Sequence, residues 1–293
     1  DIFKIPVGII QSLYYVQKFK PDAVFSKGGF ASVPPVIAAW ILRVPIVTHE
    51  SDIVPGLANK IISRFASKIL ISFSATEKYF DKNKVVLTSN PIRSDITKGN
   101  IENALKFFRL SSDLPTILIF GGSQGAQKIN EIVLESLPKI LEKYQVIHQC
   151  GDKNYKEIKN KISKLNLKHL ERYRVYPFIK NEMKDAYALA DIVIARAGAN
   201  SLFEIIALNK PSIIIPLSTS ANDHQMENAK FFAEKGMITL IKEENLTVDV
   251  LMKELSKILQ EDDFRDNMTR KMDEYNSGKK NAAKLIAEEI ISI

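Results

Sequence analysis

Residues 191–216 constrain the fold of this chain more than any other stretch, because two apolar runs there flank a helical pattern. The runs at 192–194 and 213–215 consist of isoleucine and valine, which is typical of buried strands. A tight loop containing Gly198 precedes the helical pattern. Strand, loop, helix and strand in this order form the building block of a parallel α/β sheet.

The loop of this unit predicts a ligand site. In parallel sheets, ligands bind beyond the carboxyl ends of the strands, where helix N-termini present N–H groups. Gly198 would let the backbone approach a ligand, and the carboxylate of Glu204, one turn into the helix, would accept two hydrogen bonds from a ribose diol. The alternative interpretation is a helix-capping loop with a solvated glutamate.

Composition narrows the class of protein. The 293 residues are 45% hydrophobic and 26% charged, as in a globular protein with room for two domains. Cys150 is the single cysteine, so no disulfide forms within the chain and a reducing compartment is expected. The sequence has neither an 18-residue apolar run nor a signal-peptide pattern. The net charge of +7 favours an acidic partner, but the basic residues are scattered and no nucleic-acid-binding motif occurs, so no nucleic acid is expected.

Strands and helices alternate along the rest of the chain, which predicts two parallel-sheet domains. The first domain has only about four strands and no opening βα unit, so we expect the chain to be an N-terminally truncated piece of a longer protein. Residues 97–114 read as a polar connection between the domains. Strands are expected at 22–26, 45–49, 68–73, 85–88, 116–120, 146–149, 173–176, 192–194, 213–215 and 238–241.

A second glycine-rich loop, Gly-Gly-Ser-Gln-Gly-Ala at 121–126, follows an expected strand and precedes a helix that begins at Gln127. This order makes backbone N–H groups available to an anion, although such glycines also serve simple tight turns. Four loops at one sheet edge then predict a nucleotide-sugar site, and they comprise residues 121–126, 177–179, 196–204 and 218–225.

Six motifs along the chain resemble a known family. They are GGFASVP at 28–34, HESDIVPGLANK at 49–60, NPIR at 90–93, GGSQGAQKIN at 121–130, RAGANSLFEI at 196–205 and DHQMENA at 223–229. In this order they closely resemble the MurG family of bacterial transferases, glycosyltransferase family 28. The resemblance implies a GT-B fold, in which two Rossmann-like domains face each other across a cleft. The first, incomplete at its N-terminus, would comprise residues 1–93 and 278–293, and the second, which binds UDP-GlcNAc, residues 94–277.

The resemblance also implies an activity. An inverting hexosyltransferase of this family moves GlcNAc from UDP-GlcNAc to the 4-hydroxyl of MurNAc in undecaprenyl-diphosphate-MurNAc-pentapeptide, which converts lipid I to lipid II for peptidoglycan. Such an enzyme would work as a peripheral protein on the cytoplasmic face of the inner membrane. Two alternatives remain open: a UDP-GlcNAc 2-epimerase, which shares the fold, and a nucleotide-sugar-binding remnant without transferase activity.

Roles for single residues follow from the resemblance as well. Ser123 and the neighbouring glycines would contact the donor diphosphate, Ile179 would read the uracil base, and Glu204 would bind the ribose. The substrate-binding residues that the resemblance implies are Asp52, Arg93, Gly122, Ser123, Gln124, Gly125, Ile179, Arg196, Gly198, Ala199, Asn200, Ser201, Leu202, Glu204, His224, Gln225 and Asn228.

The acceptor side is less well matched. His49 and Glu50 match the family motif and are the candidate general bases, with a group in the absent N-terminal segment as the alternative. The family usually continues with Gln-Asn, whereas Ser51-Asp52 follows here. An ionised carboxylate at Asp52 cannot donate a hydrogen bond, so its contact with the acceptor would differ.

Neither a metal nor another cofactor is expected. No DxD-like pair lies in a donor loop, and the helix N-terminus after 121–126 would offset the charge that develops on the diphosphate. The lipid-linked acceptor implies contact with an anionic membrane surface. Lys60, Arg64 and Lys68, with Ile61 and Phe65 beside them, would suit such a surface, although a solvated basic helix face is an alternative.

Overall fold

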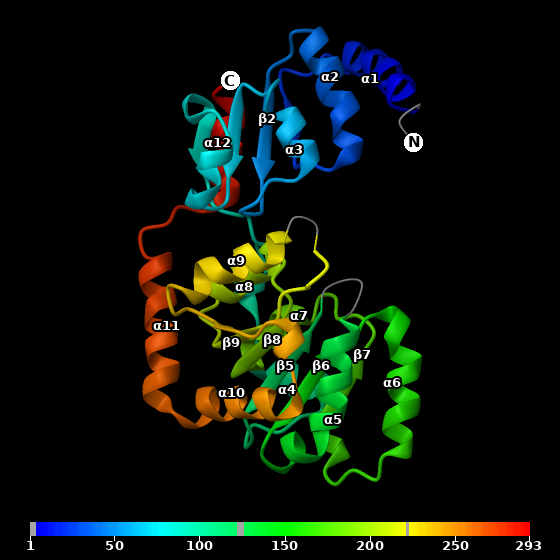
Figure 1. Ribbon diagram of the computed structural model, residues 1–293, viewed down its shortest axis with the longest axis vertical. Helices are drawn as coiled ribbons and strands as arrows, with labels where there is room; N and C mark the ends of the chain where they lie inside the picture. Colours follow the sequence, from blue (N-terminus) through cyan, green and yellow to red (C-terminus); the bar gives the residue numbers. More distant parts are fainter. Residues whose placement is uncertain (1–3, 122–125, 221–222) are drawn as a thin grey trace. The chain divides into compact units, whose positions relative to one another are not determined.

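Two all-parallel sheets form the frame of the protein, one in each of two compact units (Figure 1). The computed structural model describes residues 4–121, 126–220 and 223–293. The first unit comprises Asp1–Pro91, Ala221–Glu227 and Lys279–Ile293, and the second comprises Ile92–Ser220 and Asn228–Gly278. Two parallel-sheet α/β domains confirm the predicted fold class.

The first sheet has the order β1-β2-β3-β4, with strands β1 (Val24–Ser26), β2 (Ile46–Glu50), β3 (Lys68–Ile71) and β4 (Val85–Leu87). Its helices are α1 (Lys4–Phe19), α2 (Val33–Ile41), α3 (Leu57–Ile62) and α12 (Ala282–Ile291). Helices α2 and α3 bury Val36 and Ile62 against Ile46 and Ile69 of the sheet. Helix α12 packs Ile286 against Val47 and Leu70, which alternate with the first set and face the opposite side.

The second sheet has the order β10-β9-β8-β5-β6-β7. Its strands are β5 (Thr116–Phe120), β6 (Gln145–Gln149), β7 (Tyr173–Tyr176), β8 (Ile192–Ala195), β9 (Ser212–Ile214) and β10 (Thr239–Leu240). The chain moves outward from β5 to β7, then returns to the centre at β8 and moves outward the other way. This is the doubly wound order of a Rossmann fold. Strands β5, β6, β8 and β9 are buried along their whole length, which explains the apolar runs of β5, β8 and β9.

Helices cover this second sheet. They are α4 (Ile101–Phe108), α5 (Gln127–Lys143), α6 (Asp152–Lys164), α7 (Met183–Leu189), α8 (Ala199–Ala207), α9 (His224–Ala233), α10 (Val248–Gln260) and α11 (Asp262–Asn276). Helix α5 contacts α6 and α10, α4 contacts α7, and α8 contacts α11. Thr247 caps α10, as its side chain accepts a hydrogen bond from Val250 N at 3.3 Å.

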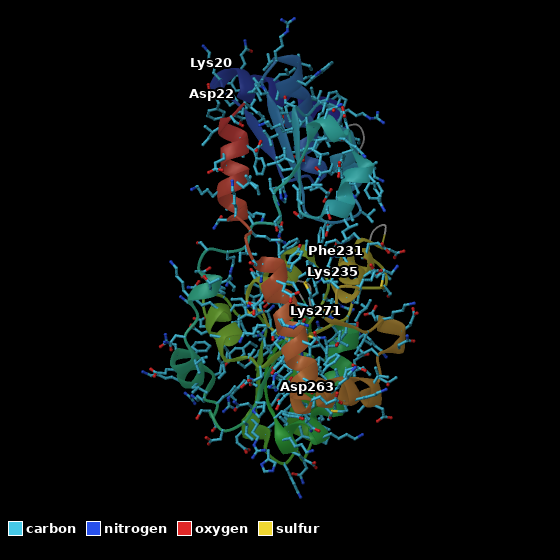
Figure 2. The ribbon with its side chains drawn as sticks, turned by 90° about the vertical axis from the view of Figure 1, so that its left-hand side faces the viewer. Lys20, Asp22, Phe231, Lys235, Asp263 and Lys271 are labelled. Atoms are coloured by element: carbon cyan, nitrogen blue, oxygen red, sulfur yellow. The ribbon has the colours of Figure 1, made fainter. Side chains whose placement is uncertain are left out.

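Helix α11 runs along the second unit (Figure 2) and packs there against α8 and α9. The rings of Tyr275 and Phe232 meet edge to face, 5.6 Å apart, and Asn276 Nδ2 donates to Ile206 O at 2.7 Å. Lys271 lies against Gly236, whose φ of +69° favours glycine in the turn after α9. Helix α11 therefore supports α8 and α9, the two helices that follow predicted ligand loops.

Candidate functional site

Strands β5 and β8 lie side by side at the centre of the second sheet, and the loops that follow them lead to opposite sides. This is the topological switch point of the sheet, where Rossmann-type folds bind ligands. A Cβ on Gly121 would lie 2.3 Å from Ala126 Cβ, so only glycine lets the first loop close in this way. The predicted residues Gly122, Ser123, Gln124 and Gly125 lie outside the described part of the chain.

Glu204 is oriented by two neighbours before any ligand binds. Tyr187 Oη donates to Glu204 Oε2 at 3.3 Å, and Arg93 Nε lies 3.8 Å from Oε1. Burial raises the pKa of Glu204, and the charge of Arg93 and the hydrogen bond from Tyr187 oppose that rise. Two predicted residues, Arg93 and Glu204, are thus brought together, and Tyr187 was missed by the sequence reading.

The first turn of α8 presents its backbone rather than its apolar side chains. Leu202 is fully buried, and its N–H donates to Gly198 O at 3.0 Å, so its side chain belongs to the core. Ala199 is buried as well, whereas Asn200 is exposed and Ser201 is half-buried. Gly198 has an ordinary φ of −65°, and a Cβ there would meet open space. A ligand would meet the N–H groups of this turn through that space.

Arg196 is a buried residue whose guanidinium has three partners. Its Nη1 donates to Ile215 O at 3.1 Å and to Pro216 O at 3.2 Å, and its Nη2 donates to Glu243 Oε1. Glu243 Oε2 in turn accepts from Ser218 N at 3.2 Å and from Ser218 Oγ at 2.6 Å. We call Arg196, Ser218 and Glu243 the loop clamp, because together they hold the segment that follows β9.

Electrostatics favours the ionised clamp. Burial alone would raise the pKa of Glu243, but the hydrogen bonds from Ser218 and Arg196 lower it overall. A cavity of about 490 Å³ opens beside the clamp and reaches Ala126 and Gln127 at the start of α5. The sequence predicted that Arg196 contacts a ligand. In the structure, the guanidinium group of Arg196 is bound to Ile215, Pro216 and Glu243 of the protein itself.

Ile179 is positioned by a residue of β6. Its N–H donates to Gln149 Oε1 at 2.8 Å, which fixes the orientation of the peptide that was predicted to read a base. Next to Gln149, His148 Nε2 lies 2.9 Å from Asn130 Oδ1 of α5, and Nδ1 lies 2.7 Å from Tyr173 Oη. Burial lowers the pKa of His148 to about 3, so the ring is neutral and ties α5 to the sheet.

Asn228 connects α9 with the loop after β8. It is fully buried, and its Nδ2 donates to Ala197 O at 3.4 Å. His224 and Gln225, one turn earlier on α9, are half-buried and group with the first unit.

In the first unit, His49 is held as a neutral imidazole. Its Nε2 lies 3.1 Å from Ser89 O, and because a carbonyl only accepts, Nε2 carries the proton. Nδ1 then accepts from Lys27 Nζ at 2.7 Å. Burial, followed by the charge of Lys27, lowers the pKa of His49 to about 4. The lone pair that a general base would use is therefore occupied in this arrangement.

Glu50 shapes the loop that follows β2. Its carboxylate accepts from Asp52 N at 3.0 Å, Gly56 N at 3.3 Å and Asn59 Nδ2 at 2.8 Å, and burial raises its pKa. Asp52 is fixed further by Thr76 Oγ1, which donates to Asp52 O at 3.2 Å. A Cβ on Gly28 would come within 2.7 Å of the Asn59 amide, so this loop and the glycine turn after β1 fit closely.

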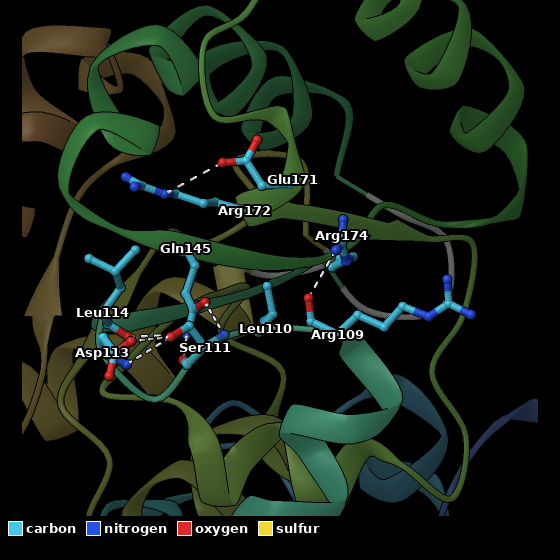
Figure 3. Close-up of a pocket in the computed structure, with 9 residues that line it drawn as sticks. All are labelled: Arg109, Leu110, Ser111, Asp113, Leu114, Gln145, Glu171, Arg172 and Arg174. Atoms are coloured by element: carbon cyan, nitrogen blue, oxygen red, sulfur yellow. Dashed lines mark hydrogen bonds and ion pairs between the residues drawn. The ribbon is translucent and has the colours of Figure 1, made fainter.

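Figure 3 shows another cavity, of about 490 Å³, at the opposite, amino-terminal edge of the second sheet. Two of its three arginines, Arg172 and Arg174, are bound to backbone carbonyls. Arg174 Nε donates to Phe108 O at 2.6 Å and Nη2 to Arg109 O at 2.9 Å, while Arg172 Nη1 donates to Leu141 O at 2.9 Å. These bonds join the connection before β5 to β7, and we assign the cavity a structural role.

Within residues 4–121, 126–220 and 223–293, no three His, Cys, Asp or Glu side chains come together as a metal site. In the same ranges, no helix is both long and apolar enough to cross a bilayer.

The model of the glycosyltransferase family 28 N-terminal domain matches residues 1–71, and that of its C-terminal domain matches residues 116–290. The chain is 42% identical over 291 residues to UDP-N-acetylglucosamine--N-acetylmuramyl-(pentapeptide) pyrophosphoryl-undecaprenol N-acetylglucosamine transferase 2 of Bacillus cereus, covering 99% of this chain and 79% of that protein. The transferase of Clostridium perfringens is 42% identical over 287 residues, covering 98% of this chain and 78% of its own.

Among solved structures, MurG of Acinetobacter baumannii superposes with a TM-score of 0.77 at 28% identity, covering 100% of this chain and 81% of that chain. A putative UDP-N-acetylglucosamine 2-epimerase of Listeria monocytogenes superposes with a TM-score of 0.72 over 97% of this chain and 77% of that chain. At 13% identity, the second likeness shows the fold alone.

Proposed function

The chain belongs to glycosyltransferase family 28, and we propose that it transfers GlcNAc from UDP-GlcNAc to the 4-hydroxyl of MurNAc in undecaprenyl-diphosphate-MurNAc-pentapeptide. One observation carries this conclusion: the 42% identity to the Bacillus cereus transferase extends over 99% of the chain, so it includes the motifs of both halves. The predicted transferase activity and its place in cell-wall synthesis rest on the same similarity.

The reaction is a single inverting displacement. The MurNAc 4-hydroxyl oxygen forms a bond to C1 of GlcNAc, the bond from C1 to the diphosphate breaks, and the hydroxyl proton passes to a base. The N–H groups and the dipole at the start of α5 would offset the charge on the leaving UDP. Positioning two substrates contributes up to roughly 7 to 11 kcal/mol, more than a base, which gives about 10²- to 10⁴-fold.

For the donor, we assign the ribose diol to Glu204, with Arg93 and Tyr187 holding its carboxylate. The peptide of Ile179, oriented by Gln149, would read the base. The start of α9, with His224, Gln225 and Asn228, would hold the sugar hydroxyls. His49 and Glu50 are assigned positioning roles, because their polar atoms are bound to other parts of the first unit.

A transfer assay tests this function. The purified chain is incubated with UDP-GlcNAc and a lipid-linked MurNAc-pentapeptide analogue, and we expect a disaccharide product together with equimolar UDP. Formation of the 2-epimer of the donor without acceptor consumption would instead identify an epimerase. Tight binding of UDP-GlcNAc with neither product would identify a binding remnant.

We further propose that the chain is a peripheral protein of the cytoplasmic face of the cell membrane, because its acceptor is a lipid. The expected basic stripe of Lys60, Arg64 and Lys68 does not form one helix face, because only Lys60 lies on α3 and Lys68 begins β3. Lys68 Nζ is also bound to Glu289 Oε2 at 2.6 Å and to Ser292 Oγ at 2.8 Å. The surface of α1 and α2 is a better candidate, as these helices pack together and expose large apolar side chains. The exposed residues are Val7, Ile10, Tyr14, Tyr15, Phe19, Trp40 and Ile41.

Replacing Ile10 and Trp40, which are 68% and 56% exposed, by serine should weaken binding to phosphatidylglycerol vesicles by about tenfold per residue, the value of burying one such side chain. Vesicle flotation measures this. Ile101→Ser is the matched control, because Ile101 is 52% exposed on the second unit. Equal flotation of all variants would contradict this placement of the membrane surface.

A further inference from the structure

Lys27, the residue directly after β1, carries an ammonium group that two neighbours hold at the carboxyl edge of the first sheet. Its Nζ lies 2.7 Å from His49 Nδ1 and 2.9 Å from Ser51 Oγ. An ammonium has three N–H donors, and the described residues use two of them. The residue as a whole is exposed, and the described residues leave one donor of its ammonium for a ligand.

The support under Lys27 is buried and fixed. His49 is fully buried, and Ser89 O determines which of its ring nitrogens carries the proton. The ring therefore presents a lone pair to Lys27 and cannot take part in another contact through Nε2. His49 crosses from the end of β2 to residues beyond β4, so it fixes the ammonium relative to three of the four strands.

The surroundings leave room for a ligand. Gly28 and Gly29 follow with φ of +80° and +86°, a turn that glycine adopts without strain, and a Cβ on Gly29 would meet open space. The carboxylates that face Lys27 are Glu50 and Asp52, whose charges raise its pKa, whereas burial, the larger effect, lowers it. Glu50 is already bound by three donors from its own loop.

We propose that Lys27 binds a phosphate group of one of the two substrates and that His49 is the positioning residue that aims it. This rests on the proposed function, in which UDP-GlcNAc and the lipid-linked acceptor each carry a diphosphate. A rigid cation at the carboxyl edge of a parallel sheet, beside an open glycine turn, is suited to an anionic group. His49 then acts through Lys27 instead of removing the proton of the acceptor.

Steady-state kinetics of Lys27→Met and Lys27→Arg test the contact. Lys27→Met should raise the KM of one substrate about ten- to hundredfold, the range for losing one charge-assisted hydrogen bond, and leave the other KM unchanged. Lys27→Arg should stay within a few-fold of wild type. A rise in the acceptor KM assigns the acceptor phosphate, and a rise in the donor KM assigns the donor. Lys82→Met, another exposed lysine of the same unit, is the control.

Inorganic diphosphate separates this proposal from the proposed function. Its binding is measured by calorimetry without and with saturating UDP, with no transfer required. Lys27→Met should weaken it about tenfold or more, in both conditions if Lys27 holds the acceptor phosphate and only without UDP if it holds the donor phosphate. Equal binding by wild type and Lys27→Met, together with unchanged KM values, would overturn the proposal even if transfer occurs. Absence of transfer with Lys27-dependent diphosphate binding would overturn the proposed function alone.

The positioning role of His49 has its own readouts. His49→Gln keeps an acceptor for Lys27 and should retain a lower KM than His49→Leu, with kcat changed less than KM in both variants. In Lys27→Met, the pKa of His49 measured by NMR should rise above its value of about 4, because the neighbouring charge is gone. Ser51→Ala removes the second hydrogen-bond partner of the Lys27 ammonium, at a partly exposed position. It should raise the same KM less than His49→Leu does. A His49→Leu variant that melts like wild type and keeps its KM would contradict this role.

Discussion

Replacing Glu204 by alanine should weaken UDP-GlcNAc and UDP binding by about 10²- to 10⁴-fold. The carboxylate would accept two hydrogen bonds from the ribose, each worth about 1.5 to 3 kcal/mol because the acceptor is charged. Tyr187 and Arg93 already orient the carboxylate, so little entropy is lost when the ribose binds. Calorimetry with both ligands measures the change.

Matched variants show whether the effect belongs to the carboxylate itself. Glu204→Gln keeps the shape and should retain part of the affinity. Tyr187→Phe removes only the hydrogen bond at 3.3 Å and should cost about tenfold or less. The melting temperature of Glu204→Ala should stay near that of wild type, because Arg93 is 44% exposed and is not left as a buried charge. Wild-type UDP affinity in Glu204→Ala would contradict the ribose assignment.

The strands could be predicted closely from the sequence, because most of them are short runs rich in β-branched or aromatic residues between loop signals. The predicted bounds of β5 and β7 agree with the structure. Helix α4 was not predicted from the sequence. It has eight residues and buries only Ala104 and Phe108, so its apolar pattern is too short to be recognised as helical. The cap was the available signal, since Asn100 Oδ1 accepts a hydrogen bond from Asn103 N at 2.9 Å.

The loops of the site were also predictable, whereas the supports of its residues were not. The loop that follows a parallel strand lies at the carboxyl edge of the sheet. The alternation of strands and helices in the sequence therefore predicted that Glu204 and the start of α8 lie at this edge. Gln149, Tyr187 and Glu243 meet their partners only through the fold, at separations of 30, 17 and 47 residues. The one local signal was the polar pair His148-Gln149 at the end of the fully buried strand β6.

Breaking the loop clamp should destabilise the second unit strongly. Glu243→Ala would leave the guanidinium of Arg196, whose side chain is 8% exposed, without its carboxylate. Removing one partner of a buried pair costs about 3 to 5 kcal/mol, which corresponds to a fall in melting temperature of roughly 10 °C for a domain of this size. Glu244→Ala is the control, because Glu244 is the exposed neighbour.

Two further measurements decide whether the charge pair causes that loss. A double variant, Arg196→Met with Glu243→Met, should recover much of the stability, because it leaves no unpaired charge. The pKa of Glu243 is lowered in the folded protein, so its contribution should be full above the usual value of 4.5 and disappear as the pH falls through the folded value. The free energy of unfolding of wild type should therefore decrease as the pH falls and Glu243 becomes protonated. Glu243→Ala should not show this part of the pH dependence. If Glu243→Ala and Glu244→Ala melt together at neutral pH, the clamp does not hold the loop after β9.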